Sequence, residues 1–318
     1  MKVLLRQCDL SDEYIRFAQQ IGADGIDIHN AQSIPGFIEQ GYPDLESLRA
    51  IKQRINDANM VLCRIAPQDD ALDFMLGKPG GEKDIENLKK TIEILGELDI
   101  PFLSTPFNFE NPGHRGGTRY GHRGGYAMGG TDLDKMKQSM EEDPWVPTVS
   151  IEDHWKRSIE LLKALVPVAE KYNVKLITHP SDPPLSNSHL SPQRWTDLME
   201  AVPSTHNGML YCVGTRYESG VDICEDIRYY AAKGWIFHTH IRNVKGQLPT
   251  HGCYQEVAMD DGSMNMFTVL KTLQDVGFDG GLQLDHMPSY DYDDEHRKIA
   301  WGYAVGYVKA LLRALRAP

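Results

Sequence analysis

The sequence predicts a (β/α)8 barrel, the TIM-barrel fold, and three of its features lead to this prediction. Eight short apolar or β-branched segments alternate with longer segments whose apolar residues recur at i, i+3, i+4 and i+7. Strict alternation implies a parallel sheet, and eight units suggest that this sheet closes on itself. The main alternative is a doubly wound open sheet, but no Gly-rich phosphate-binding fingerprint follows the first expected strand.

The expected strands cover residues 2–8, 25–30, 60–66, 101–108, 174–180, 208–214, 235–243 and 280–287. Between them lie amphipathic segments such as "DIENLKKTIEILGEL" and "HWKRSIELLKALVPVAEKY", which predict helices. Ser11 and Ser191 are expected to cap two helices, because a serine hydroxyl accepts from the free N–H groups of a first helical turn. No linker or shift in composition separates the units, so residues 1–318 are expected to form a single domain.

The longest interruption of the alternation is residues 109–150, between the fourth expected strand and the following helix. It is rich in glycine and contains "GHRGG" twice, at 113–117 and 121–125. In a barrel this insertion would lie at the C-terminal end of a strand, on the face where active sites form. Two interpretations stay open, a lid over an anionic substrate and a surface loop.

The composition excludes several classes of partner. A formal net charge of −12 argues against nucleic acids and anionic membranes, which need a basic surface. No segment approaches the ~18 apolar residues of a membrane span, and the N-terminal "MKVLLRQCDL" lacks the apolar region of a signal peptide. Five scattered cysteines do not suggest a disulfide framework. We expect a cytoplasmic protein with a small-molecule substrate and, by analogy with barrels of this size, a homo-oligomer.

Metal-binding residue types end four consecutive expected strands. These residues are His179, Cys212, His240 and Asp285. Active sites of barrels form at the C-terminal ends of the strands, so the four side chains should converge. Two imidazoles, a thiolate and a carboxylate suit a borderline divalent ion such as Mn²⁺, Fe²⁺, Co²⁺ or Zn²⁺. Taken singly, each residue has an ordinary explanation as a core histidine, a small apolar cysteine or a helix-capping aspartate. The occurrence of all four at the ends of consecutive strands favours a metal site.

A second histidine, His238, precedes His240 by two residues in the same expected strand. Side chains alternate across a strand, so both imidazoles should point to one face. His238 lies deeper in the barrel, and we expect it to fill the interior or to support His240 from behind.

Four motifs, "HPSDPP", "YCVGT", "HIRNVKG" and "LDHM", occur here in an order and spacing similar to those of mannonate dehydratases. Those enzymes are metal-dependent TIM barrels of the xylose-isomerase-like group. The likeness extends to "LLRQC" near the start and "WGYAVGYVKALL" near the end; it is strong over 174–315 and weak over 60–150. The resemblance implies a hydro-lyase that converts D-mannonate to 2-keto-3-deoxy-D-gluconate, by removal of the C2 proton and loss of the 3-hydroxyl.

The resemblance also implies roles for individual residues. The family's metal ligands, which hold one Mn²⁺ or Fe²⁺, fall on the same four positions, His179, Cys212, His240 and Asp285. Its acid/base pair matches His286 and Tyr303, with the direction of proton transfer left open. The residues expected near the substrate are Arg6, Asp182 and Arg242.

The chain departs from the family's pattern at several positions. Ser181 replaces a usual aspartate, Leu284 and Met287 replace the proline and glycine around the Asp-His pair, and the 109–150 insertion looks unlike the family's loop. These departures leave open a different sugar acid as substrate. They also leave two alternatives, a metal-dependent isomerase or epimerase of the same barrel group and a sugar-acid-binding barrel without turnover.

Overall fold

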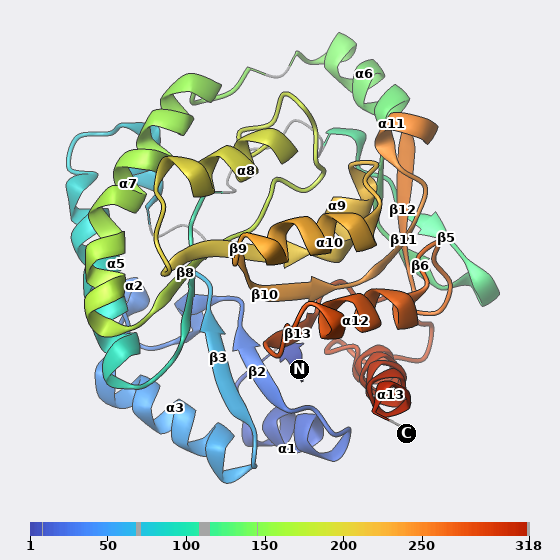
Figure 1. Cartoon of the computed structure of the whole chain (residues 1–318), viewed down its shortest axis with the longest axis horizontal. Coiled ribbons are helices and arrows are strands. Elements are labelled where there is room, and N and C mark those ends of the chain that lie inside the picture. The colour runs from blue at the N-terminus through green and yellow to red at the C-terminus, as the bar shows by residue number, and fades with distance from the viewer. Residues whose placement is uncertain (8, 68–70, 108–114, 145, 317–318) are drawn as a thin grey trace.

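The computed structural model describes residues 1–7, 9–67, 71–107, 115–144 and 146–316. Its centre is a closed barrel of eight parallel strands in the order β1-β13-β10-β9-β8-β4-β3-β2 (Figure 1). These strands are β1 (Lys2–Arg6), β2 (Gly25–Ile28), β3 (Val61–Ile65), β4 (Phe102–Ser104), β8 (Lys175–Thr178), β9 (Asn207–Cys212), β10 (Ile236–Ile241) and β13 (Gly281–Leu284). The predicted (β/α)8 barrel is therefore confirmed, with every strand inside or within one residue of its expected range.

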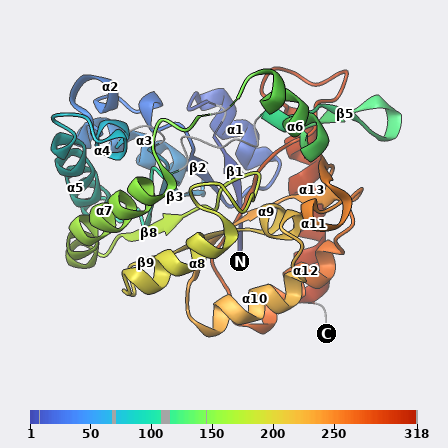
Figure 2. The same cartoon turned by 90° about the horizontal axis from the view of Figure 1, so that it is seen from above.

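Helices surround the barrel, as Figures 1 and 2 show. The longer ones are α1 (Asp12–Gln20), α3 (Leu45–Asp57), α5 (Glu82–Glu97), α7 (Ile151–Tyr172), α8 (Pro192–Ala201), α10 (Ile223–Ala232), α12 (Met266–Asp275) and α13 (Lys298–Leu315). Short turns of helix are η1 (Ala31–Ser33), α2 (Phe37–Gln40), α4 (Leu72–Leu76), α9 (Val213–Glu218) and α11 (Leu248–His251). None of the helices among the described residues is both long and apolar enough to cross a membrane.

The local sequence explains why these helices begin and which side they bury. The Ser11 hydroxyl accepts from the Tyr14 N–H at 3.1 Å, and the Ser191 hydroxyl accepts from the Arg194 N–H at 3.4 Å, so both predicted caps are confirmed. Helix α3 is an example of how the helices pack: Leu48, Ile51 and Ile55 recur at helical spacing and are buried in the core shared with the barrel.

The described part of the insertion forms its own small elements at the open end of the barrel. These are β5 (Tyr120–Gly121), η3 (Arg123–Gly125), β6 (Ala127–Met128), β7 (Gly130–Asp132) and α6 (Leu133–Glu142). Strand β7 pairs antiparallel with β12 (Cys253–Val257), which pairs in turn with β11 (Asn243–Lys245), directly after β10. The insertion is thereby fixed to the chain that leaves the barrel, while the β5–β6 hairpin projects at the edge of the molecule (Figure 2).

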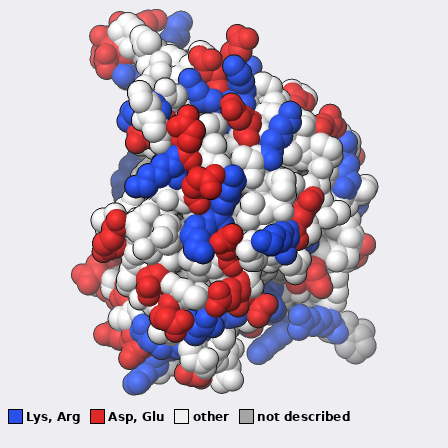
Figure 3. Space-filling view, turned by 90° about the vertical axis from the view of Figure 1, so that its left-hand side faces the viewer, with Lys and Arg blue, Asp and Glu red and all other residues white. Residues whose placement is uncertain are grey.

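The surface charge is mixed rather than segregated on the face shown in Figure 3, where basic and acidic side chains lie among one another. The net charge of −12 therefore does not form one acidic patch on that face.

A stacked pair of buried histidines joins the two ends of the insertion to the loop after β8. The rings of His154 and His189 lie 4.3 Å apart, centroid to centroid, and 8° from parallel. His154 Nε2 donates to the Phe107 carbonyl and His189 Nε2 to the Val149 carbonyl, each at 2.9 Å. Phe107 precedes the insertion and Val149 lies near its C-terminal end, so the pair links these two residues to the loop after β8.

This pair predicts a loss of stability in mild acid. Burial lowers the pKa of His154 to about 3, whereas an unfolded histidine titrates near its usual ~6.5. The unfolded chain therefore binds the proton first, and stability present above pH 6.5 falls as the pH drops toward 3. This one group should remove about 2 kcal/mol from the free energy of unfolding between pH 7 and 5. Urea unfolding of the wild type and His154→Gln at both values measures this, and equal losses in the two proteins would contradict it.

Candidate metal centre

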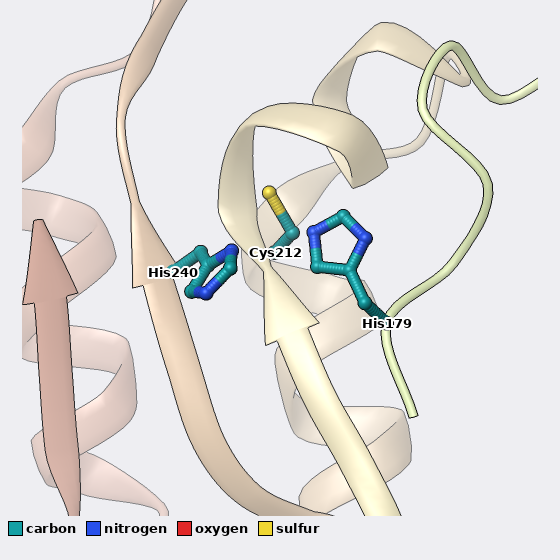
Figure 4. Close-up of side chains that lie close together, drawn as sticks. All are labelled: His179, Cys212 and His240. Atoms are coloured by element: carbon teal, nitrogen blue, oxygen red, sulfur yellow. The ribbon is translucent and has the colours of Figure 1, made fainter. Parts of the chain in front are cut away.

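Three of the four predicted ligands converge at the C-terminal end of the barrel. One ligand atom each of His179, Cys212 and His240 lies within 4.8 Å of the other two, as Figure 4 illustrates. Cys212 and His240 are register partners at the ends of β9 and β10, and His179 follows β8 directly. Neighbouring parallel strands thus place two imidazoles and one thiolate side by side, a donor set that fits a borderline divalent ion.

The surroundings of His179 leave one ring nitrogen available for a metal. Its Nδ1 lies 2.6 Å from the Pro180 carbonyl oxygen and must donate to it, so in the neutral ring Nε2 carries the lone pair that a metal would use. Burial lowers the pKa of the His179 imidazole, although the charges of Asp182 and Asp285 act in the opposite direction. The ring is therefore neutral at pH 7, as a metal ligand must be.

Cys212 is fully buried, and its sulfur accepts hydrogen bonds from Thr215. The Sγ atom lies 3.2 Å from the Thr215 hydroxyl and 3.5 Å from the Thr215 amide. Burial by itself raises the pKa of the Cys212 thiol, but the positive charge of Arg242 acts in the opposite direction, and the pKa is lowered. Lowering the pKa favours the thiolate, the form that binds metals.

Asp285, the fourth predicted ligand, lies at the edge of this group and is shared among several cations. Its carboxylate is 3.4 Å from His240 Nδ1, and three further contacts at 3.6–3.7 Å reach His286, Arg6 and Arg242. Burial raises the pKa of Asp285, but the charges of His240 and His286 outweigh burial and hold it well below its usual range. Asp285 is thus a carboxylate in contact with one member of the group, His240.

A cavity of about 690 Å³ opens onto the group, a volume typical of small-molecule sites. The predicted site residues that line it are Arg6, His179, Asp182, His240, Asp285 and His286. The insertion contributes another part of the wall through Gly117, Gly129, Gly130 and Thr131. The cavity therefore joins strand-end side chains to the described part of the insertion.

Arg242 does not line this cavity, although it was expected near the substrate. The side chain is 1% exposed, and its guanidinium pairs with the carboxylates of Asp182, Glu218 and Glu256. It also donates to the Thr215 hydroxyl at 2.7 Å. Arg242 thus holds the walls of the site in place from behind.

Tyr303 is a third predicted residue that does not line the cavity, after Cys212 and Arg242. It lies on α13 with 41% of its surface exposed, where it stacks on Tyr307 and contacts Asp260 and Arg123. Partial burial and the Asp260 carboxylate raise the pKa of Tyr303 to about 12. The phenol is therefore both outside the cavity and protonated at neutral pH.

A second cluster beside the metal group was only partly anticipated. One ligand atom each of Asp182, Glu256 and His286 lies within 4.8 Å of the others, and His286 Nδ1 is 2.5 Å from Glu256 Oε1. Burial opposes protonation of His286, but the carboxylates of Asp285 and Glu256 raise its pKa to about 9. The cluster already encloses a cation, because Arg242 pairs with both Asp182 and Glu256.

Two residues of this region, Glu256 and Tyr254, were not among the predicted site residues. Tyr254 donates to Asp182 Oδ1 at 3.2 Å, and both Tyr254 and Glu256 line the cavity. They lie on β12, outside the barrel, so a search restricted to the ends of barrel strands passes over them. The available indication was the segment "YQEVAMDDG", in which Glu256 stands where the family resembled has an acidic residue.

Fold and site together define the class of (β/α)8 barrels with a His, Cys and His group at the C-terminal end of the strands. The model of the D-mannonate dehydratase family matches residues 122–315, which is more than half of the chain. This protein belongs to the D-mannonate dehydratase family, a family of hydro-lyases, and the resemblance of its motifs is confirmed.

Individual relatives agree with this assignment. The mannonate dehydratase of Brachyspira hyodysenteriae is 26% identical over 311 residues, which span 84% of this chain and 86% of the relative. The crystal structure of mannonate dehydratase from Streptococcus suis serotype 2 has a TM-score of 0.76 at 23% identity, and covers 99% of this chain and 95% of that one. D-psicose 3-epimerase from Clostridium cellulolyticum H10 has a TM-score of 0.66 at 14% identity, with 98% and 99% covered. The two structural likenesses show the fold alone.

Proposed function

We propose that this protein is a metal-dependent sugar-acid dehydratase that converts D-mannonate to 2-keto-3-deoxy-D-gluconate. The observation that supports this most is the approach of His179, Cys212 and His240 to one another beside a cavity that also contains His286. Family membership supplies the reaction class.

The metal would be held by His179, Cys212, His240 and Asp285, and we propose Mn²⁺ or Fe²⁺. When bound, it supplies Lewis-acid stabilisation of the negative charge that develops as the C2 proton leaves. Arg6, which is partly exposed in the cavity, offers a guanidinium to the carboxylate of the substrate.

The reaction breaks the C2–H and C3–O bonds, so that one proton leaves C2 and one reaches the departing hydroxyl. We assign His286 to the departing 3-hydroxyl, because its ring lines the cavity and is held at Nδ1 by Glu256. Its raised pKa favours the protonated form that can donate. Tyr303 lies outside the cavity, which leaves the C2 proton to a carboxylate of the wall, Asp182 or Glu256.

The described part of the insertion supports its role as a lid. Gly117, Gly129 and Thr131 line the cavity, and the pairing of β7 with β12 places them there. We propose that the described part of the insertion, residues 115–144 and 146–150, shields the reacting atoms from water when a substrate is bound; residues 109–114 and 145 lie outside the described residues.

The direct test is incubation with D-mannonate of protein loaded with Mn²⁺ or Fe²⁺, beside a chelator-treated sample. The proposal predicts the 2-keto-3-deoxy product in the loaded sample only. No product with any divalent metal would contradict D-mannonate as substrate. Interconversion of a ketose without loss of water would instead identify an epimerase of the same barrel group.

A further inference from the structure

Beneath the metal group, polar side chains from opposite sides of the barrel form one connected network. Arg64 on β3 and Gln283 on β13 are both fully buried and are hydrogen-bonded to each other. We infer that Gln283, oriented by Arg64, holds His240 in the tautomer that carries its proton on Nε2 and leaves Nδ1 free for the metal. The part of this inference that concerns the metal rests on the proposed function.

The first step is the contact between His240 and Gln283. The two residues are register partners on β10 and β13, so both side chains point into the barrel. His240 Nε2 lies 3.1 Å from Gln283 Oε1. An amide oxygen only accepts, so Nε2 must carry the hydrogen, and the lone pair of a neutral imidazole is then on Nδ1. Nδ1 is also the nitrogen that faces Asp285, at 3.4 Å.

The second step is the orientation of the Gln283 amide, which decides the tautomer. A flipped amide would present its NH₂ group to His240 and select the opposite tautomer. Arg64 prevents this flip, because its Nη2 donates to the same Oε1 and a guanidinium has no acceptor to offer an NH₂ group. The Gln283 nitrogen is used in turn, since it donates to the Leu284 carbonyl at 3.3 Å.

The third step is what holds Arg64. Its Nε lies 3.3 Å from Asp27 Oδ2, and its Nη1 donates to the Ser104 hydroxyl at 2.9 Å. His238 also approaches Asp27, with its Nε2 2.9 Å from the same oxygen. His238 is thus connected to Arg64 through Asp27, and we propose that it supports His240 through this network.

Removing the acceptor from residue 283 should weaken metal binding without removing a ligand. In Gln283→Leu we expect a 10–100-fold loss of Co²⁺ affinity, the usual effect of losing the partner of a ligating histidine. Gln283→Glu keeps an acceptor oxygen that Arg64 also binds, so its affinity should stay close to that of the wild type. The measurement is titration with Co²⁺ against a competing chelator, followed by the thiolate-to-cobalt absorption.

Two further variants distinguish a specific loss of metal affinity from a general loss of protein stability. Thr239→Val, on the same strand, removes a buried hydrogen bond of 2.9 Å to the Gly281 carbonyl but no contact of a ligand, and should bind Co²⁺ like the wild type. Gln283→Met has the chain length of glutamine without its amide and should behave like Gln283→Leu.

The tautomer itself can be read without metal by ¹⁵N NMR of the histidine rings. We expect His240 to carry its proton on Nε2 in the wild type and in Gln283→Glu, and to lose this preference in Gln283→Leu. Unchanged affinity and an unchanged tautomer in Gln283→Leu would overturn the inference. A wild-type protein that binds no Co²⁺ would contradict the metal site of the proposed function, while the tautomer would still decide the role of Gln283.

Discussion

Replacing His286 with asparagine is expected to lower turnover of the sugar acid by roughly 10²–10⁴-fold, the usual contribution of a general acid or base. The bound metal should remain, because His286 is not among the three side chains that converge. Asparagine cannot deliver a proton to the departing hydroxyl, whatever the protonation of its neighbours. Steady-state kinetics together with metal analysis of the same sample measure both parts of this prediction.

The matched control is His206→Asn, at the opposite end of the barrel just before β9. His206 contacts Asn173 and has no part in the cavity, so turnover should equal that of the wild type. Full activity in His286→Asn would remove His286 from the mechanism. Loss of metal in that variant would show instead that His286 supports the ligand Asp285, which lies 3.6 Å away.

Replacing Cys212 with serine is expected to weaken metal affinity by about 100-fold or more, since losing a ligand should cost at least as much as losing a ligand's hydrogen-bond partner. A hydroxyl stays protonated at neutral pH and is a harder, poorer donor for a borderline ion than a thiolate. Turnover should fall in parallel and recover partly at high metal concentration. Metal titration and kinetics at several metal concentrations measure this.

Cys63→Ser is the control for this substitution. Cys63 is also buried on a barrel strand, β3, but burial and the Asp27 charge raise the pKa of its thiol to about 12, and among the described residues Cys63 belongs to neither group of possible metal ligands. Its serine variant should keep the metal content of the wild type. Equal metal affinity in Cys212→Ser and wild type would exclude Cys212 as a ligand.

The barrel could be predicted because its pattern is local. Each unit shows its own apolar run and its own helical periodicity, so eight units are countable before any contact between them is known. The strand lengths were less predictable: residues 101–108 were expected to be extended, but only Phe102–Ser104 belong to β4. Apolar residues continue beyond the end of β4, and the sequence does not show at which residue the hydrogen bonds of the sheet end.

The metal group could also be predicted from a local pattern. The hydrogen-bond network of Arg64 and Gln283 beneath it could not. His179, Cys212 and His240 each end a strand, and a closed parallel barrel brings consecutive strand ends together. Arg64 and Gln283 were visible as polar residues within apolar strands, "MVLCRIA" and "GGLQLDHM". Their contact joins opposite sides of the barrel, and such a distance depends on the diameter and tilt of the closed sheet.

Tyr303 and Arg242 show the limits of carrying residues over by resemblance. Tyr303 lies on α13, and its position relative to the cavity depends on the course of residues 285–297 between β13 and that helix. Arg242 points inward with His240, as alternation requires, but carboxylates from three other segments surround it. The neighbours of Tyr303 and of Arg242 in space cannot be deduced from the place of either residue in its own helix or strand.

The central claim is that one divalent metal is held by residues at the ends of β8, β9 and β10, and elemental analysis of the wild type beside His240→Ala tests it most directly. We predict about one transition-metal ion per chain in the wild type, as purified or after reconstitution with Mn²⁺, and its loss in the variant. No bound metal in the wild type under either condition would contradict the metal centre and, with it, the proposed dehydratase mechanism.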